Sequence, residues 1–459
     1  MTYTHDIVER IVNFDNAAIP PHIIDHAKLF VLDTIGCAIG GYTTLYGSQI
    51  VAQAKAFQGA GEATIIGESS RISVPFAAWA NSCLVNVLDM DDVYAGTAHQ
   101  ANCLVPTALS IGEKQQASGL AVLQAIILGF EVGSRIMMYS WPSPAKGRTY
   151  FPSTWQVFDA VTAAGVLLGL DERTLYHAFG LAGMVPPIPI DMQKFVERPI
   201  GFAKNVFGWT TFTGIFWTLM AQQGAEGVAD ILDGEAGFWT MMGSDQHDFE
   251  QLLQGWGVTY ALMDTKFKPY PLCTWGHSTV DCFEQIIREN HIEADDIEGI
   301  HVRTLQRAVD YLSSPQMETL YDSQFSLPHA LAMVALGKKA GPEWMSNENM
   351  FRNPEAKAIA SKVTMAADPK ADLVFDEEKG LAIPTEVTVK TVRKKTYAKR
   401  LKYSKGTTNN PFTPEELKDK FRKLASSLFD EERIHEIMDC VLNLDKLDDI
   451  SFLTKLLSK

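Results

Sequence analysis

Apolar residues recur at helical spacing along most of the first 255 residues, and this pattern constrains the fold more than any other feature of the chain. Strand signals are few there, with one short β-like run at 63–67. The pattern therefore predicts a large all-helical domain. Its expected helices span residues 4–14, 21–33, 74–88, 104–115, 118–139, 154–168, 172–184, 205–224 and 245–253.

The pattern changes near Thr265, where strand and helix signals begin to alternate. We expect strands at 299–305, 361–366 and 385–403, the last as a hairpin, and a helix at 325–337. The basic run from Lys390 to Lys405 fits the solvated face of that hairpin.

The chain returns to helix after residue 405, where Thr413, Pro414 and Glu416 form a capping-box pattern. We therefore expect a mainly α fold: an all-helical domain of residues 1–265, completed by the helices of 405–459, with a smaller α+β lid domain of 266–404 inserted between them.

Composition excludes several classes of function. The 459 residues carry a formal net charge of −15, which argues against binding to nucleic acid or to an anionic membrane. The six cysteines include no CxxC pair, so no zinc or iron–sulfur site is indicated, and buried thiols in a reducing compartment are expected. No signal peptide is visible, and the apolar run at 206–221 is short for a membrane span. We therefore expect a cytoplasmic protein.

Three acids and one imidazole lie within eleven residues: Asp89, Asp91, Asp92 and His99. In a helix, Asp89 and Asp92 would share one face, and like charges that close raise the pKa of one of them. Gly96 lets the chain turn, which would bring His99 back towards the acids. A polar helix end with a solvated histidine is the alternative interpretation.

Cations for an anionic substrate could come from the segment 265–277, TKFKPYPLCTWGH. Lys266 and Lys268 alternate along an extended, proline-rich stretch. We expect Thr274 to cap the following helix and His277 to lie in its first turn, where the helix dipole favours a neutral imidazole and a nearby anion. Surface lysines and a capping histidine are the alternative.

The acidic segment resembles the LDxDDxH…HPS…PAAL…E segment of the MmgE/PrpD family. It reads Leu88-Asp89-Met90-Asp91-Asp92, then His99, then Pro106-Thr107-Ala108-Leu109 and Glu113. Val93 stands where a threonine is usual, and Gln100 where the family has proline. Further resemblances are LDTIGC at 32–37, LLGLD at 167–171, and residues 405–421, which are similar to KGxxxNPxTxxELxxKF.

The family includes 2-methylcitrate dehydratase, cis-aconitate decarboxylase and iminodisuccinate epimerase, which act on small polycarboxylates without a metal. The resemblance thus implies a cofactor-free, metal-independent lyase, such as a dehydratase, with a 2-methylcitrate-like or aconitate-like substrate. An epimerase or isomerase of an iminodisuccinate-like dicarboxylate is the alternative, as is a catalytically inactive polycarboxylate-binding homologue. We also expect a homodimer.

The resemblance also implies site residues. Lys268 and His277 match the family's KxYPxC…H motif, and Lys204 is the nearest counterpart of a family lysine that precedes an apolar helix. Many members have a histidine where this chain reads 148–153, RTYFPS, and a tyrosine where His329 stands. The expected catalytic residues are His99, Asp89, Asp92, His277 and Lys268, and the expected substrate-binding residues are Lys266, Lys204, Arg148, Tyr150 and His329.

In the mechanism that we expect, lysines and Arg148 hold substrate carboxylates. A histidine removes a proton α to one of them, or next to the leaving hydroxyl, as general base. Asp89 and Asp92 orient that histidine, and one of them stays protonated to act as an acid. The same arrangement could serve elimination, epimerisation or decarboxylation.

Overall fold

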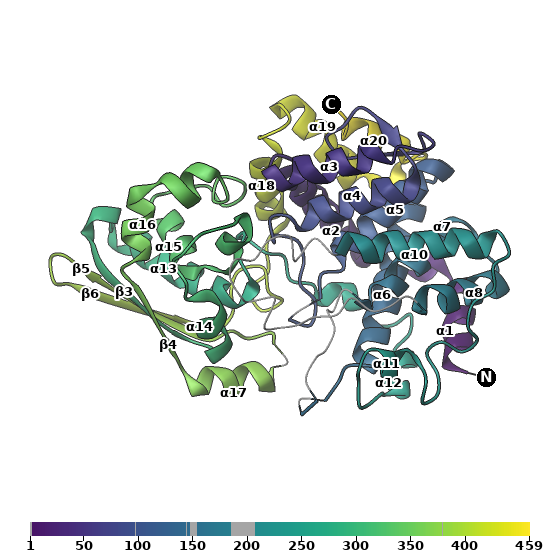
Figure 1. The fold of residues 1–459 in the computed structure, drawn as a ribbon, viewed down its shortest axis with the longest axis horizontal. Coiled ribbons are helices and arrows are strands. Elements are labelled where there is room, and N and C mark those ends of the chain that lie inside the picture. The colour runs from purple at the N-terminus through teal and green to yellow at the C-terminus, as the bar shows by residue number, and fades with distance from the viewer. Residues whose placement is uncertain (1, 97, 144, 147–153, 185–206, 379) are drawn as a thin grey trace.

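The computed structural model describes residues 2–96, 98–143, 145–146, 154–184, 207–378 and 380–459. The chain is mainly α, as predicted, with helices on one side of Figure 1 and a small sheet with its own helices on the other. We call these the helical part and the α+β part. The boundaries of the domains and the function of the α+β part as a lid stay predictions.

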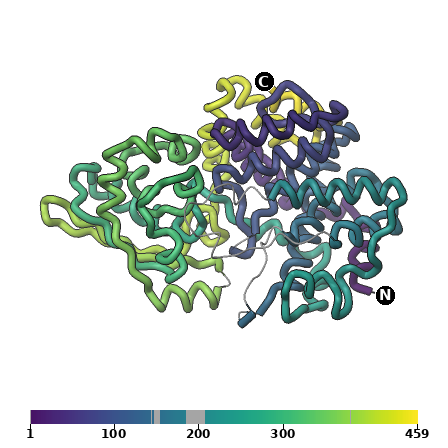
Figure 2. Tube along the Cα trace, in the orientation of Figure 1, coloured from purple at the N-terminus to yellow at the C-terminus, as the bar shows by residue number. Residues whose placement is uncertain are grey.

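The helical part is built from the helices between Tyr3 and Leu253 together with those between Pro414 and Leu456. The C-terminal helices return to it, as the yellow segment in Figure 2 shows. Its helices are α1 (Tyr3–Val12), α2 (Pro21–Tyr42), α3 (Leu45–Ala56), α4 (Val74–Asn86), α5 (Ala101–Gln115), α6 (Gly119–Tyr139), α7 (Val157–Leu167), α8 (Glu172–Gly183), α10 (Phe207–Gln222), α11 (Phe238–Met241), α12 (Phe249–Leu253), α18 (Pro414–Ala425), α19 (Glu431–Leu442) and α20 (Ser451–Leu456).

Most predicted helices of this part are present, with some shifted ends. The helix expected at 245–253 is shorter, because the Asp248 carboxylate accepts hydrogen bonds from the backbone N–H groups of Glu250 and Gln251 and so starts α12 at Phe249. The β-like run at 63–67 contributes only β1 (Ala63–Thr64), which pairs antiparallel with β2 (Arg71–Ile72). Helix α6 is long and apolar enough to cross a membrane, yet 83% of its most apolar window is buried among the other helices.

The α+β part has a four-stranded sheet in the order β4-β3-β5-β6, in which β3 and β4 are parallel and the other pairs antiparallel. The hairpin predicted in 385–403 is confirmed as β5 and β6. The elements are α13 (His277–Asn290), β3 (Ile297–Thr304), α14 (Gln306–Leu312), α15 (Leu327–Ala335), α16 (Pro354–Ala360), β4 (Val363–Ala367), α17 (Pro369–Glu377), β5 (Thr385–Thr391) and β6 (Thr396–Leu401).

The α+β part has its own hydrophobic core, whose buried members all come from residues 270–389. Helix α13 packs on β5 and β6, and the apolar side chains of β5 alternate inwards. Several basic side chains of the hairpin are exposed, and Lys390 and Lys394 pair there with Glu298, whereas Lys399 pairs with Glu289 of α13. That arrangement agrees with the solvated face predicted for this run.

The two parts meet around the loop that follows α4. Gly96 in this loop has φ 72° and Gly380 after α17 has φ 84°. A Cβ atom placed on Gly96 would lie 3.3 Å from the Cα of Gly380, and one on Gly380 would lie 3.4 Å from the Cα of Gly96. Backbone therefore touches backbone between the two parts at this point.

Candidate active site

The acidic segment forms a buried turn rather than a helix. Helix α4 ends at Asn86, and Asp89 adopts a left-handed conformation with φ 51°. The prediction that Asp89 and Asp92 share one face of a helix is therefore wrong. The positive φ at Asp89 redirects the chain, so that neighbouring acids of the turn contact different elements.

Asp92 caps a helix. Its carboxylate accepts hydrogen bonds from the backbone N–H groups of Gln100, at 3.2 Å, and Ala101, at 2.9 Å, at the start of α5. Burial, followed by repulsion from Asp91, raises the pKa of Asp92 well above its usual range. We expected one carboxyl group of the acidic segment to have a raised pKa, and this group is Asp92. Its carboxylate accepts hydrogen bonds from backbone N–H groups at the start of α5 rather than from His99.

Asp91 is the acid that contacts the histidine. Its Oδ1 atom lies 3.4 Å from Nδ1 of His99, and its carboxylate accepts hydrogen bonds from the side-chain amides of Asn86 and Asn102. Burial raises the pKa of Asp91, but the interactions with His99 and then Lys268 outweigh it, so that the pKa is lowered. Among the described contacts, the orienting one on His99 is made by Asp91, an acid that was not assigned this role in advance.

The basic segment lies directly against this turn. The backbones of Val93 and Lys266 exchange two hydrogen bonds, of 2.8 and 2.9 Å. Two residues further on, Nζ of Lys268 lies 2.5 Å from Oδ1 of Asp89, and both side chains are fully buried. The structure thus brings together the two segments that the sequence analysis singled out, and it pairs one catalytic candidate from each.

His277 is the first residue of α13, as the prediction of a first-turn position required. Its Nε2 atom lies 2.8 Å from the carbonyl oxygen of Leu272. Burial, and then the neighbouring Lys266 and Lys268, lower the pKa of His277 well below its usual value, so the imidazole is neutral. The prediction that Thr274 caps α13 is wrong. Its hydroxyl accepts a hydrogen bond from Lys266 and makes no cap contact with the helix.

The expected substrate-binding residues are more dispersed. Lys266 is buried and donates hydrogen bonds to two hydroxyls. His329 lies near the start of α15, where its Nε2 atom is 2.9 Å from the carbonyl oxygen of Trp344, and it faces a separate hollow. Arg148, Tyr150 and Lys204 lie outside the described residues.

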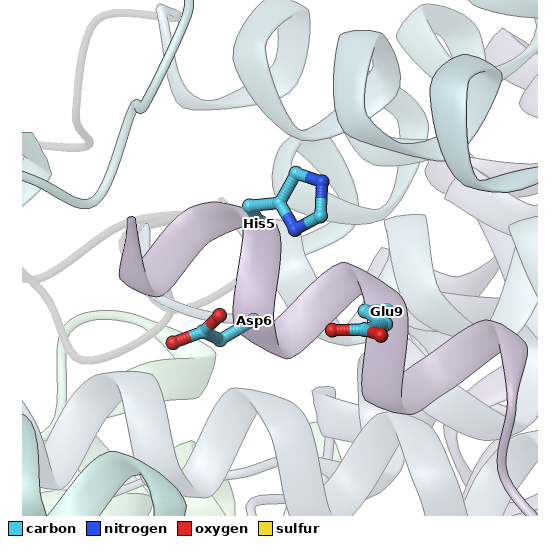
Figure 3. Close-up of side chains that lie close together, drawn as sticks. All are labelled: His5, Asp6 and Glu9. Carbon is cyan, nitrogen blue, oxygen red and sulfur yellow. The ribbon is translucent and has the colours of Figure 1, made fainter. Parts of the chain in front are cut away.

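Asp89, Asp91 and His99 also have the geometry of a ligand group, with one possible ligand atom of each within 4.8 Å of the others. Lys268 and the amide groups of Asn86 and Asn102 already donate to these carboxylates, which compensates their charge. A second group, His5, Asp6 and Glu9, lies on α1 in the helical part (Figure 3). There His5 pairs with Glu172 at 2.9 Å.

The fold and the site define a class of protein: a mainly helical chain with an α+β part, in which buried acid–base pairs join segments far apart in sequence. The model of the MmgE/PrpD N-terminal domain matches residues 5–251, and the model of the MmgE/PrpD C-terminal domain matches residues 270–446. The chain belongs to the MmgE/PrpD family.

Several relatives are similar to the chain over nearly its whole length. The cis-aconitate decarboxylase of Aspergillus terreus is 25% identical, over 99% of this chain and 96% of that protein. The cis-aconitate decarboxylases of mouse and human are 25% and 23% identical, over 95% of this chain and 89% and 90% of those proteins. The resemblance noted in separate motifs thus extends through both parts.

Proposed function

We propose that this chain is a metal-independent lyase that acts on a small, aconitate-like or 2-methylcitrate-like polycarboxylate. The named relatives are cis-aconitate decarboxylases, which supports an enzyme of the lyase type. The observation that carries the proposal is the buried Lys268–Asp89 pair beside the Asp91–His99 contact. A cation and an oriented imidazole in one buried place suit a substrate with carboxylates on neighbouring carbons.

In the proposed mechanism, His99 transfers a proton to or from the carbon next to a substrate carboxylate. Asp91 holds the ring and stabilises the imidazolium that forms. Lys268 stabilises charge that develops on the substrate, and Asp89 sets the position of its ammonium group. His277 supplies a neutral imidazole beside the two lysines; its Nε2–H donates to the carbonyl oxygen of Leu272, so its Nδ1 atom can accept a proton.

We further propose that the α+β part closes over the site as a lid, that the protein is a cytoplasmic homodimer, and that Arg148, Tyr150 and Lys204 contribute to substrate binding. His329, which was also expected to do so, lines a separate hollow. The pairing of Val93 with Lys266 supports a site that needs both parts, because it joins the acidic turn to the entry of the α+β part.

A proton NMR screen in heavy water tests the proposal. The protein is incubated with cis-aconitate, citrate, 2-methylcitrate and related acids, and deuterium at carbon is followed together with product signals. A lyase is expected either to release carbon dioxide and place a deuteron on the carbon that lost it, or to release water and form an alkene product. Exchange without net product would make the chain an epimerase or isomerase. If no acid exchanges or reacts while several bind, the chain is a binding protein and the lyase proposal fails.

A further inference from the structure

Lys266 lies where the chain enters the α+β part, and two hydroxyl groups accept hydrogen bonds from its side-chain amine. Nζ donates hydrogen bonds to Oγ1 of Thr274, at 2.7 Å, and to Oγ of Ser404, at 2.9 Å. The residue is only 8% exposed. Within the described parts of the chain no carboxylate forms an ion pair with it, whereas Lys268 has Asp89 as its partner.

This set of partners suits an uncharged amine. An uncharged lysine has two N–H groups, and the two hydroxyls accept both of them. A charged ammonium would have a third N–H group and a buried positive charge beside a second lysine. Burial, and then Lys268, accordingly lower the pKa of Lys266 to about 7.

Lys266 joins three segments that together build the site, two through its side chain and one through its backbone. Thr274 lies three residues before His277, and Ser404 lies where the chain leaves the α+β part. The backbone of Lys266 pairs with Val93 of the acidic turn. The adjacent residue, Phe267, donates its N–H to the carbonyl oxygen of Gly406. A backbone hydrogen bond therefore also joins the segment that enters the α+β part to the segment that leaves it.

We propose that Lys266 is a positioning residue. Its buried amine, in the uncharged form, ties the segment before His277 to the segment at Ser404, and its backbone holds both against the turn that carries Asp89 and His99. This inference deepens the proposed function and rests on it for its kinetic consequences. It replaces the direct substrate contact expected of Lys266, because the two hydroxyls already occupy its N–H groups.

The groups that face Lys266 determine its response to pH. Lys268 on the same segment disfavours a positive charge, whereas Asp281 on α13 and Cys273 before it favour one. His277, the first residue of α13, also lies beside Lys266 and is neutral. Above about pH 7 the folded protein releases a proton that the unfolded chain keeps up to about pH 10.4. Lys266 should therefore make the folded state more stable as pH rises through this window, and less stable towards its lower end.

Thermal unfolding tests, without any substrate, whether Lys266 makes the folded state more stable as pH rises. Wild type, Lys266→Met and the control Lys390→Met, an exposed lysine of β5 paired with Glu298, are melted between about pH 6 and pH 9. The folding constant of wild type relative to Lys266→Met should rise with pH, approaching roughly tenfold per pH unit well above pH 7. Lys390→Met should stay parallel to wild type. Parallel curves for Lys266→Met would overturn the inference.

A matched pair at Thr274 tests the positioning role even if Lys266→Met does not fold. Thr274→Val keeps the size and removes the hydroxyl, whereas Thr274→Ser keeps the hydroxyl. We expect Thr274→Val to lower kcat roughly fivefold with little change in KM, and Thr274→Ser to act like wild type. Equal kcat in the two variants would contradict positioning by this hydrogen bond. If wild type turns over no acid, the proposed function fails, and the melting curves still decide the state of Lys266.

Discussion

Nζ of Lys420, on α18, donates a hydrogen bond of 2.7 Å to the carbonyl oxygen of Met90, which lies between Asp89 and Asp91 in the acidic turn. The same ammonium lies 2.7 Å from Oδ1 of Asp33 on α2. All three groups are buried. Helix α18 therefore fixes the backbone of the candidate active site, although it is more than 300 residues away in sequence.

Changing Lys420 to Met should destabilise the fold strongly. The substitution leaves the carboxylate of Asp33 buried without its cation, and breaking such a pair from one side costs about 3–5 kcal/mol of unfolding free energy. Chemical denaturation measures this loss. Lys418→Met on the same helix, which removes only a surface pair with Glu415, should change stability by less than about 1 kcal/mol. Equal losses in the two variants would show that the buried pair is not stabilising.

Changing Lys268 to Met should impair turnover and also destabilise the protein, because Asp89 would then be buried without a partner. The double variant Asp89→Asn/Lys268→Met removes both charges. We expect it to recover much of the stability lost by Lys268→Met and none of the activity. A double-mutant cycle on unfolding free energy and kcat/KM separates the two effects. Recovery of activity in the double variant would place this pair outside the chemistry.

His99→Ala should reduce turnover by roughly a hundred- to ten-thousand-fold, which is the usual effect of losing a general base. His435→Ala, at an exposed position of α19, is the control and should be fully active. Both variants are compared by initial rates on the best acid of the NMR screen and by thermal melting. A normally folded His99→Ala enzyme within threefold of wild type would remove His99 from the mechanism.

Chelation should leave activity and melting temperature unchanged. The carboxylates of Asp89 and Asp91 already have Lys268 and amide N–H partners, so they do not depend on a metal for compensation. Dialysis against EDTA, followed by assay and melting, measures this. Loss of activity that one divalent ion restores would reassign Asp89, Asp91 and His99 as metal ligands.

The sequence predicted those parts of the fold whose signals are local. The Thr413–Glu416 capping box forms with both of its hydrogen bonds, and the hairpin at 385–403 has the expected place, because neighbouring residues determine both. Helices α14 and α16, of seven residues each, were missed because two turns contain too few apolar positions to show a period. The twelve-residue α3 was missed as well, since its small and polar residues give a weak pattern.

The site was predictable in its segments and less so in its contacts. Family resemblance pointed to both segments, and Lys268 does meet Asp89. The partner of His99 was not foreseen, because the left-handed turn at Asp89 decides which acid faces the imidazole and that φ angle has no clear sequence signal. Asn86 and Asn102, whose amides hold Asp91, were a possible clue: buried amides commonly mark a carboxylate that must be fixed.

The backbone contact between Gly96 and Gly380 offers a way to increase the separation of the two parts by a single substitution. Neither position tolerates a side chain easily, because both have positive φ and an added Cβ would lie 3.3–3.4 Å from the opposite backbone. An alanine at either glycine would act as a wedge that alters no chemical group of the site. Such a wedge separates the effect of distance between the parts from the effect of the residues they carry.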